Sequence, residues 1–259
     1  MGIKEETDVA VIGLSGGADS TLVACLCAKA LGKENVYGIH MPYNDIDSKT
    51  FNSRSMKMAT RLGIHSIVVP IGHIADSITS SVESAVGDIS TTNRGNSRSR
   101  SRMTILYGVA HQLGDTLKKR VRVVGTGNLS EDSIGYDTKG GDALADFFPI
   151  GNLFKSQVYA LLDKFKTDGI IDEEHIDRVP SAGLWDGQTD EGELGYSYNE
   201  MEPVVSAMFE NYTEDTSEII SKLLNIGFQN DLTTFVVNRH FANRHKHIAP
   251  KVLSKDDIA

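Results

Sequence analysis

The residues best suited to chemistry form a short turn, SGGADS at 15–20, which separates an apolar run from an apolar stretch of helical period. Its two glycines leave no side chain between a bound anion and the backbone amides. A helix that follows, with Ser20 as its cap, would favour negative charge at its N-terminus. The turn therefore predicts a phosphate or pyrophosphate site. A helix-capping turn that binds nothing is the structural alternative.

Asp19 does not suit a bare phosphate site, because its carboxylate would repel the anion. A divalent cation between the carboxylate and the phosphates removes this conflict. A second carboxylate, Glu131, and a cation, Lys155, occur in the later stretch GTGNLSEDSIGYDTKGGDALADFFPIGNLFK at 125–155. Glu131 could join Asp19 on Mg²⁺, and Lys155 could balance the charge of a triphosphate. A solvated surface charge is the alternative for each of these residues.

Alternating strands and helices are expected to position these groups. Apolar β-rich runs predict strands at 9–14, 36–42, 66–71 and 121–128. Periodic segments predict helices at 20–32, 50–62, 73–86, 103–114, 154–166, 199–211 and 214–225, with polar loops at 88–102 and 180–195. The pattern implies one α/β domain over 1–259, with a doubly wound, mainly parallel sheet flanked by helices. Ligands of such sheets bind beyond the carboxyl ends of the strands, where the SGGADS turn begins.

Composition narrows the class of partner. The formal net charge of −9 argues against a protein that coats nucleic acid, and no aromatic residues interleave with the arginines of SRSRSR at 97–102. Cys25 and Cys27 fall in a predicted helix on different faces, which predicts buried thiols in a reducing compartment. The charged N-terminus lacks the apolar core of a signal peptide, and no run is long enough for a membrane span. We therefore expect a cytoplasmic protein without membrane or nucleic-acid partners.

The SGGADS turn resembles the phosphate loop of the N-type ATP pyrophosphatases, enzymes of the adenine nucleotide alpha hydrolase-like fold that cleave ATP between its α and β phosphates. Four further stretches narrow the resemblance to the ammonia-dependent NAD synthetases. They are GNSRSRSRM at 95–103, the stretch at 125–155, PSAGLWDGQTDEGELGYSY at 180–198, and the pair His245-Lys246. The resemblance covers almost the whole chain.

This resemblance implies a ligase that adenylates the carboxylate of deamido-NAD with ATP and then forms NAD from ammonia, releasing AMP and pyrophosphate. It implies Mg²⁺ on Asp19 and Glu131, which with Lys155 carry the catalysis. The ATP-binding residues would be Gly13, Leu14, Ser15, Gly16, Gly17, Ala18, Asp19, Ser20, Thr126, Lys155 and Ser181. The deamido-NAD residues would be Arg100, Lys139, Asp146, His245 and Lys246. The family is homodimeric, so a homodimer is expected.

Two departures from the family pattern bear on these roles. Ser181 stands where many members have Thr, and both side chains carry the hydroxyl. Ser99 stands where Ala is usual. Arg98, Arg100 and Arg102 alternate here, and the family pattern does not decide which of them binds the substrate. Two rival functions also stay open: a tRNA-modifying ATP pyrophosphatase of the same superfamily, and a non-catalytic nucleotide-binding protein.

Overall fold

Four parallel strands form the sheet of this computed structural model, which describes residues 2–173, 181, 187–250 and 252. Within the sheet the strands follow the order β3-β2-β1-β4. Their bounds are β1 (Val9–Gly13), β2 (Val36–His40), β3 (His65–Val68) and β4 (Val121–Val124). In the centre, Ile12 of β1 pairs with Gly38 of β2 and Val124 of β4. All four predicted strands are therefore confirmed, with slightly shorter ends.

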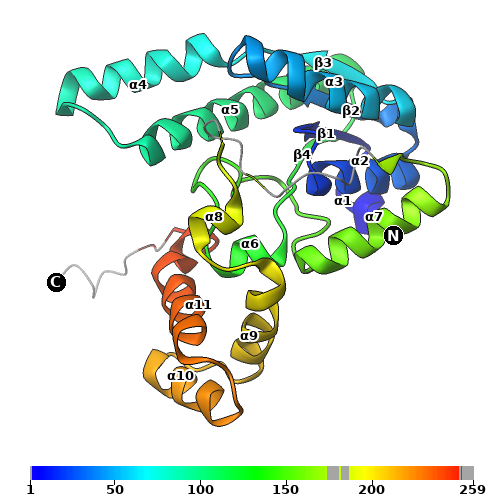
Figure 1. Cartoon of the computed structure of the whole chain (residues 1–259). Helices are drawn as coiled ribbons and strands as arrows, with labels where there is room; N and C mark the ends of the chain where they lie inside the picture. The colour runs from blue at the N-terminus through cyan, green and yellow to red at the C-terminus, as the bar shows by residue number, and fades with distance from the viewer. Residues whose placement is uncertain (1, 174–180, 182–186, 251, 253–259) are drawn as a thin grey trace.

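Helices cover both faces of the sheet. The side chains of β1 that point to either face are therefore buried. Ala10 and Ile12 pack with α2 (Ala18–Leu31), α3 (Asp45–Leu62) and α7 (Lys155–Thr167). Val9 and Val11 face α5 (Thr91–Leu117), beside which lies α4 (Gly72–Val86). Figure 1 shows α4 and α5 running together away from the sheet. The predicted doubly wound parallel architecture is confirmed.

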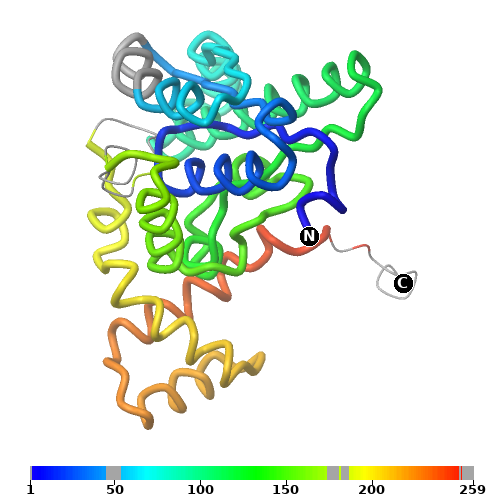
Figure 2. Tube along the Cα trace, turned by 90° about the vertical axis from the view of Figure 1, so that its right-hand side faces the viewer, coloured from blue at the N-terminus to red at the C-terminus, as the bar shows by residue number. Residues whose placement is uncertain are grey.

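A second hydrophobic core lies below the sheet in the C-terminal part of the chain, drawn from yellow to red in Figures 1 and 2. Its largest buried side chains include Met201, Met208 and Ile219. The helices around it are α6 (Leu129–Ser133), α8 (Asp190–Leu194), α9 (Tyr198–Glu210), α10 (Thr216–Asn225) and α11 (Asn230–Asn243). Three short elements complete the described chain: α1 (Gly2–Glu6), η1 (Lys33–Asn35) and η3 (Arg244–Lys246). The single-domain organisation over 1–259 stays a prediction.

The expected loop at 88–102 is wrong, because α5 already begins at Thr91. Ser90 caps it by accepting a hydrogen bond from the Asn93 amide at 3.2 Å. Within the helix, the Ser101 hydroxyl returns to the carbonyl of Ser97 at 2.8 Å, which satisfies a polar group that would otherwise favour a turn. Among the small buried residues, Gly95 and Ser99 lie on one face of the helix and Ser97 and Ser101 on another, so both faces can pack closely. α8 lies within the loop predicted at 180–195, and α11 follows the last of the predicted helices.

The two cysteines are free and buried, as predicted. Burial raises the pKa of each thiol to about 12, so both are unreactive. Among the described residues, no helix is both long enough and apolar enough to span a bilayer.

Candidate active site

The SGGADS turn connects β1 to α2 at the carboxyl edge of the sheet. Gly16 has a φ of +75°, and a Cβ there would lie 3.3 Å from the backbone nitrogen of Ser55. Only glycine fits this conformation and this approach without strain. The expectation that Ser20 caps the helix is wrong. The N-cap is Gly17, and the Ser20 hydroxyl lies in the first helical turn, where it donates to the Gly17 carbonyl at 3.1 Å.

Lys155 joins the two carboxylates that the sequence singles out. Its Nζ lies 2.5 Å from Oδ2 of Asp19 and 2.9 Å from Oε1 of Glu131. The lysine side chain is only 5% exposed, against 18% for Asp19 and 19% for Glu131. The structure thus brings together all three predicted catalytic residues, which are far apart in the chain.

Asn128 is a member of this cluster that sequence reasoning missed. It is fully buried at the N-cap of α6. Its Nδ2 donates to Oδ1 of Asp19 at 2.9 Å, and its Oδ1 accepts from the Glu131 amide at 3.1 Å. One amide side chain therefore orients the carboxylate of Asp19 and fixes the backbone of Glu131. The signal was present in the sequence, because Asn before a helix is a common cap.

The cluster holds two carboxylates and one ammonium in a buried place. Burial raises the pKa of Glu131 to about 8. The positive charge of Lys155 lowers this pKa and the negative charge of Asp19 raises it, but burial is the largest effect. Burial disfavours the ammonium of Lys155, but the carboxylates of Glu131 and Asp19 outweigh it and raise its pKa. Burial and the charge of Asp19 disfavour a second negative charge at Glu131, and a cation between the two carboxyl groups would relieve this penalty, which makes the cluster a suitable cation site.

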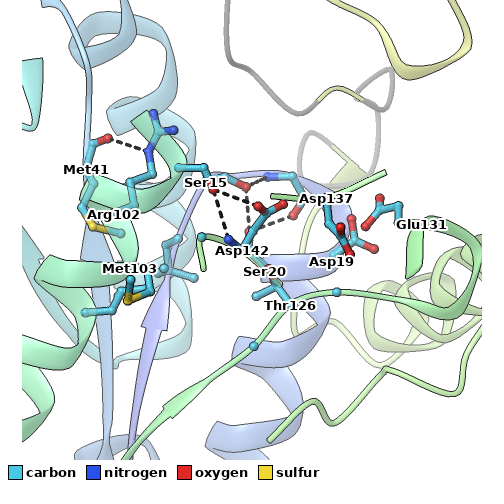
Figure 3. A pocket seen from close by; sticks show the side chains of 18 of the residues that line it. Ser15, Asp19, Ser20, Met41, Arg102, Met103, Thr126, Glu131, Asp137 and Asp142 are labelled. Atoms are coloured by element: carbon cyan, nitrogen blue, oxygen red, sulfur yellow. Dashed lines mark hydrogen bonds between the residues drawn. The ribbon is translucent and has the colours of Figure 1, made fainter. Parts of the chain in front are cut away.

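A cavity of about 260 Å³ lies beside the cluster, and Asp19 and Glu131 form part of its wall (Figure 3). Most predicted ATP residues line it: Gly13, Leu14, Ser15, Gly17, Ala18, Asp19, Ser20, Thr126, Lys155 and Ser181, together with Glu131. Gly16 is absent from the lining and lies buried behind the turn. Ser181 donates to the carbonyl of Gln188 at 2.7 Å. On the other side, Ile39, Met41 and Leu106 form an apolar wall.

Four of the five predicted deamido-NAD residues gather beside this cavity without lining it. Arg100 Nε donates to the carbonyl of Lys139 at 3.2 Å, and Lys139 Nζ donates to the carbonyl of His245 at 2.7 Å. Lys246 Nζ donates to the carbonyl of Gly135 at 2.7 Å. The C-terminal segment is thereby held against the stretch that follows Glu131, and a basic surface results.

Asp146, the fifth predicted deamido-NAD residue, has a different setting. Its carboxylate accepts from the Val123 amide at 2.7 Å, and its amide donates to the Val123 carbonyl at 3.0 Å. It thus binds the backbone of β4 while remaining exposed. Of the three alternating arginines, Arg102 lines the cavity, Arg98 lies over the ring of Tyr43 at 3.5 Å, and Arg100 contacts Lys139.

Further acidic residues in the cavity wall were not selected from the sequence: Asp132, Asp137, Asp142 and Asp190. Burial raises the pKa of Asp132 to about 7, with repulsion from Asp137 and Asp142. His247 Nε2 lies 2.5 Å from Oδ2 of Asp137, and this contact raises the pKa of the imidazole. No spacing in the sequence indicates this pair, because the fold brings the C-terminal segment back to it.

Comparison with known proteins places this chain in a family. The NAD synthase family model matches residues 3–250. The NH₃-dependent NAD⁺ synthetase of Methanosarcina acetivorans is 38% identical over 250 residues, covering 96% of this chain and 91% of that protein. The corresponding enzyme of Pyrococcus horikoshii is 42% identical over 200 residues, or 77% of this chain and 72% of that protein.

Solved structures agree with these relatives. The NH₃-dependent NAD synthetase of Campylobacter jejuni superposes with a TM-score of 0.70 at 28% identity, covering 98% of this chain and 93% of that one. The NMN synthetase of Francisella tularensis gives a TM-score of 0.72 at 28% identity, with 97% and 91% covered. The fold, the sequence and the cavity all lead to one conclusion. The chain belongs to the NAD synthase family and is a ligase of NAD biosynthesis.

Proposed function

We propose that the chain converts deamido-NAD to NAD in two steps driven by ATP, with ammonia as the nitrogen donor. A nicotinate carboxylate oxygen attacks the α-phosphorus, the Pα–O–Pβ bond breaks, and pyrophosphate leaves. Ammonia then attacks the activated carbonyl, AMP leaves, and one proton is lost. The observation that carries this proposal is the Asp19–Lys155–Glu131 cluster beneath the SGGADS turn. The family membership supports the same activity.

The cluster also fits Mg²⁺. Asp19 and Glu131 present hard carboxylate oxygens at one point of the cavity, where a cation would stabilise both ionised groups beside the single ammonium. When bound, the cation would neutralise phosphate charge. Lys155 would then be free to contact the phosphates in place of its present partners. Asn128 keeps the Asp19 carboxylate oriented through one hydrogen bond and holds the backbone of Glu131 through the other.

The remaining residues bind and orient the substrates. The turn at 15–20 offers backbone amides to phosphate oxygens at the start of α2, and the apolar wall with Met41 and Leu106 suits the flat face of adenine. We place deamido-NAD against the basic surface of Arg100, Lys139, His245 and Lys246, next to Arg102 in the cavity wall. Positioning and electrostatics supply the rate in this scheme, and no side chain acts as a nucleophile.

We also propose a homodimer. On α4, Ile78, Val82 and Val86 follow one another at four-residue spacing and are 40%, 41% and 75% exposed. Such a stripe lies on one helix face and gains stability when a second copy covers it. Sedimentation of Val82→Glu tests this. We expect a folded monomer from the variant and a dimer from the parent. A variant that stays dimeric would exclude this face as the interface.

One assay separates the proposal from its rivals. The chain is incubated with ATP, Mg²⁺, ammonium and deamido-NAD, and NAD and AMP are followed. Formation of both in equal amounts supports the proposal. Pyrophosphate release that requires tRNA and does not depend on deamido-NAD would favour a tRNA-modifying enzyme. ATP binding without cleavage would favour a non-catalytic protein. Nicotinic acid mononucleotide serves as a second substrate, because one structural neighbour is named an NMN synthetase. We expect the lower kcat/KM for it.

A further inference from the structure

Glu202 is a buried acid that the proposed chemistry does not use. It lies on α9, outside the cavity lining, and is 7% exposed. Its Oε1 accepts from the Ser130 hydroxyl at 2.7 Å and from the Ser156 amide at 3.1 Å. Its Oε2 accepts from the Ser156 hydroxyl at 2.5 Å. A single carboxylate from the C-terminal core thus reaches two serines, each next to a residue of the Asp19–Lys155–Glu131 cluster.

These contacts complete the start of α7, the helix whose first residue is Lys155. Its N-cap residue, Phe154, has no side-chain acceptor, so the first amides need partners from elsewhere. The Lys155 amide donates to the Ser130 hydroxyl oxygen at 2.9 Å, and the Ser156 amide donates to Glu202. Negative charge at a helix N-terminus is favourable. Glu202 and Ser130 therefore cap α7 from two other helices, and this cap fixes the backbone of Lys155.

The same face of α9 also reaches the other end of the lysine. Tyr198 lies four residues before Glu202, and the Lys155 Nζ lies 5.6 Å from the centre of its ring. The Tyr198 hydroxyl donates to Oδ2 of Asp190, a cavity-lining residue on α8. Two residues of one helix therefore hold Lys155, the tyrosine at its ammonium and the glutamate at its backbone.

We propose that Glu202 is a positioning residue for Mg²⁺·ATP, which sets the places of Lys155 and Glu131 by capping α7 and binding Ser130. Ser130 is covalently next to Glu131, so the same carboxylate fixes the backbone on both sides of the cluster. This role rests on the proposed function of that cluster. It predicts that loss of Glu202 affects Mg²⁺·ATP and the chemical step, and leaves binding of deamido-NAD unaffected.

The experiment compares Glu202→Ala with Glu202→Gln and with Val205→Ala. Val205 lies on the same helix, is 1% exposed and has an apolar side chain that cannot hydrogen-bond to the serines, so its truncation reports the loss of packing alone. Mg²⁺·ATP affinity is measured by calorimetry, which needs no NAD formation, and kcat, KM for deamido-NAD and the Mg²⁺ half-saturation are measured by turnover. Midpoints of thermal unfolding place the variants on one stability scale.

For Glu202→Ala we expect Mg²⁺·ATP affinity and kcat to fall about tenfold or more, because small displacements of catalytic groups have large effects. The KM for deamido-NAD should stay within about twofold. Glu202→Gln should recover most of the loss, since its amide oxygen still accepts from Ser130 and the Ser156 amide. Val205→Ala should keep its Mg²⁺·ATP affinity. Equal losses in Glu202→Ala and Val205→Ala, or a change in deamido-NAD KM alone, would overturn the proposal.

A second pair of variants covers the case in which Glu202→Ala does not fold. Ser130→Ala removes the cap of the Lys155 amide, whereas Ser156→Ala removes only the hydroxyl contact to Oε2. We expect the larger loss of Mg²⁺·ATP affinity in Ser130→Ala, and an equal, negligible effect of both would overturn the proposal. If the parent makes no NAD, the proposed function fails, yet the calorimetric comparison still decides the role of Glu202.

Discussion

The Nζ atom of Lys155 lies 2.5 Å from Oδ2 of Asp19, although 136 positions separate the two residues in the chain. The parallel sheet explains this proximity. Asp19 follows β1, and Lys155 begins the helix that packs against α2 on the same face of the sheet. Without a bound cation, the lysine supplies the positive charge that the two carboxylates need. The geometry therefore joins the proposed catalytic role and the stability of the fold at one point, and variants separate the two.

Replacement of Asp19 by Ala should abolish turnover and leave the fold intact. Lys155 keeps Glu131 as a partner, so the stability loss is small, whereas the proposed cation site loses one of its two ligands. We expect kcat to fall at least about a hundredfold, because metal and charge contacts of this kind carry much of the rate. The checks are NAD formation and circular dichroism. Asp163→Asn is the control, because its side chain is 68% exposed on α7 and far from the cavity. Near-normal turnover of Asp19→Ala would remove Asp19 from the metal site.

Replacement of Lys155 by Met should destabilise the protein in a way that Mg²⁺ reverses. The variant leaves two carboxylates close together without their ammonium, and loss of one partner from a buried ion pair costs about 3–5 kcal/mol. Added Mg²⁺ binds the two carboxylates and restores part of this stability. The measurement is the unfolding midpoint of parent and variant with and without Mg²⁺. A midpoint gain from Mg²⁺ no larger in the variant than in the parent would contradict the shared site.

The local parts of this site follow from the sequence, and the reason is physical. A glycine pair after an apolar run permits a positive φ at Gly16, and the capping preference of Asn before a helix applies at Asn128. Such signals depend only on neighbouring residues. The strands were equally accessible, because β1 is buried on both faces and reads as a continuous apolar run, and β4 departs from this pattern only at the exposed Arg122.

The parts that sequence reasoning missed depend on contacts between distant segments. Ser90 is a local signal for the start of α5, but the serines that follow favour a loop and suit the helix only when their hydroxyls return to its backbone. Asp137 is paired with His247 across more than 100 positions. The choice among Arg98, Arg100 and Arg102 also needs the fold, which places Arg102 in the cavity wall. Roles in substrate binding stay predictions.

Replacement of Gly16 by Ala should weaken ATP binding beyond its effect on stability. An alanine at a φ of +75° costs about 1–2 kcal/mol of folding free energy. Its Cβ would also lie 3.3 Å from the backbone nitrogen of Ser55, which would displace the SGGADS turn. Gly87→Ala is the matched control. Gly87 has a φ of +84° at the end of α4, and a Cβ there meets nothing within 4 Å. We expect similar losses of stability in both variants and a loss of ATP affinity, by calorimetry, in Gly16→Ala alone. Equal ATP affinities would show that the turn does not hold the phosphates.

His40 should make stability depend on pH in the acid range. At the end of β2 it is 1% exposed, and its two ring nitrogens lie 2.7 Å from the Ser55 hydroxyl and 2.8 Å from the Ser66 hydroxyl. Burial lowers the pKa of this imidazole below the ordinary value of about 6.5. The unfolded chain therefore binds a proton at His40 more readily than the folded chain does. The contribution of His40 to the free energy of unfolding is complete above about pH 6.5 and decreases as the pH falls through the folded-state pKa.

The measurement is urea unfolding of the parent and of His40→Gln at pH 8, 6 and 5. We expect the parent to lose stability between pH 8 and 5 more steeply than the variant, which is less stable at pH 8 because it loses a hydrogen bond in the core. The difference between the two should shrink as the pH falls, since the other titrating groups are common to both. A constant difference at all three values would mean that His40 does not titrate on unfolding. Ser55 also lies next to Gly16 of the SGGADS turn. Protonation of His40 should therefore lower the affinity for ATP over the same range of pH.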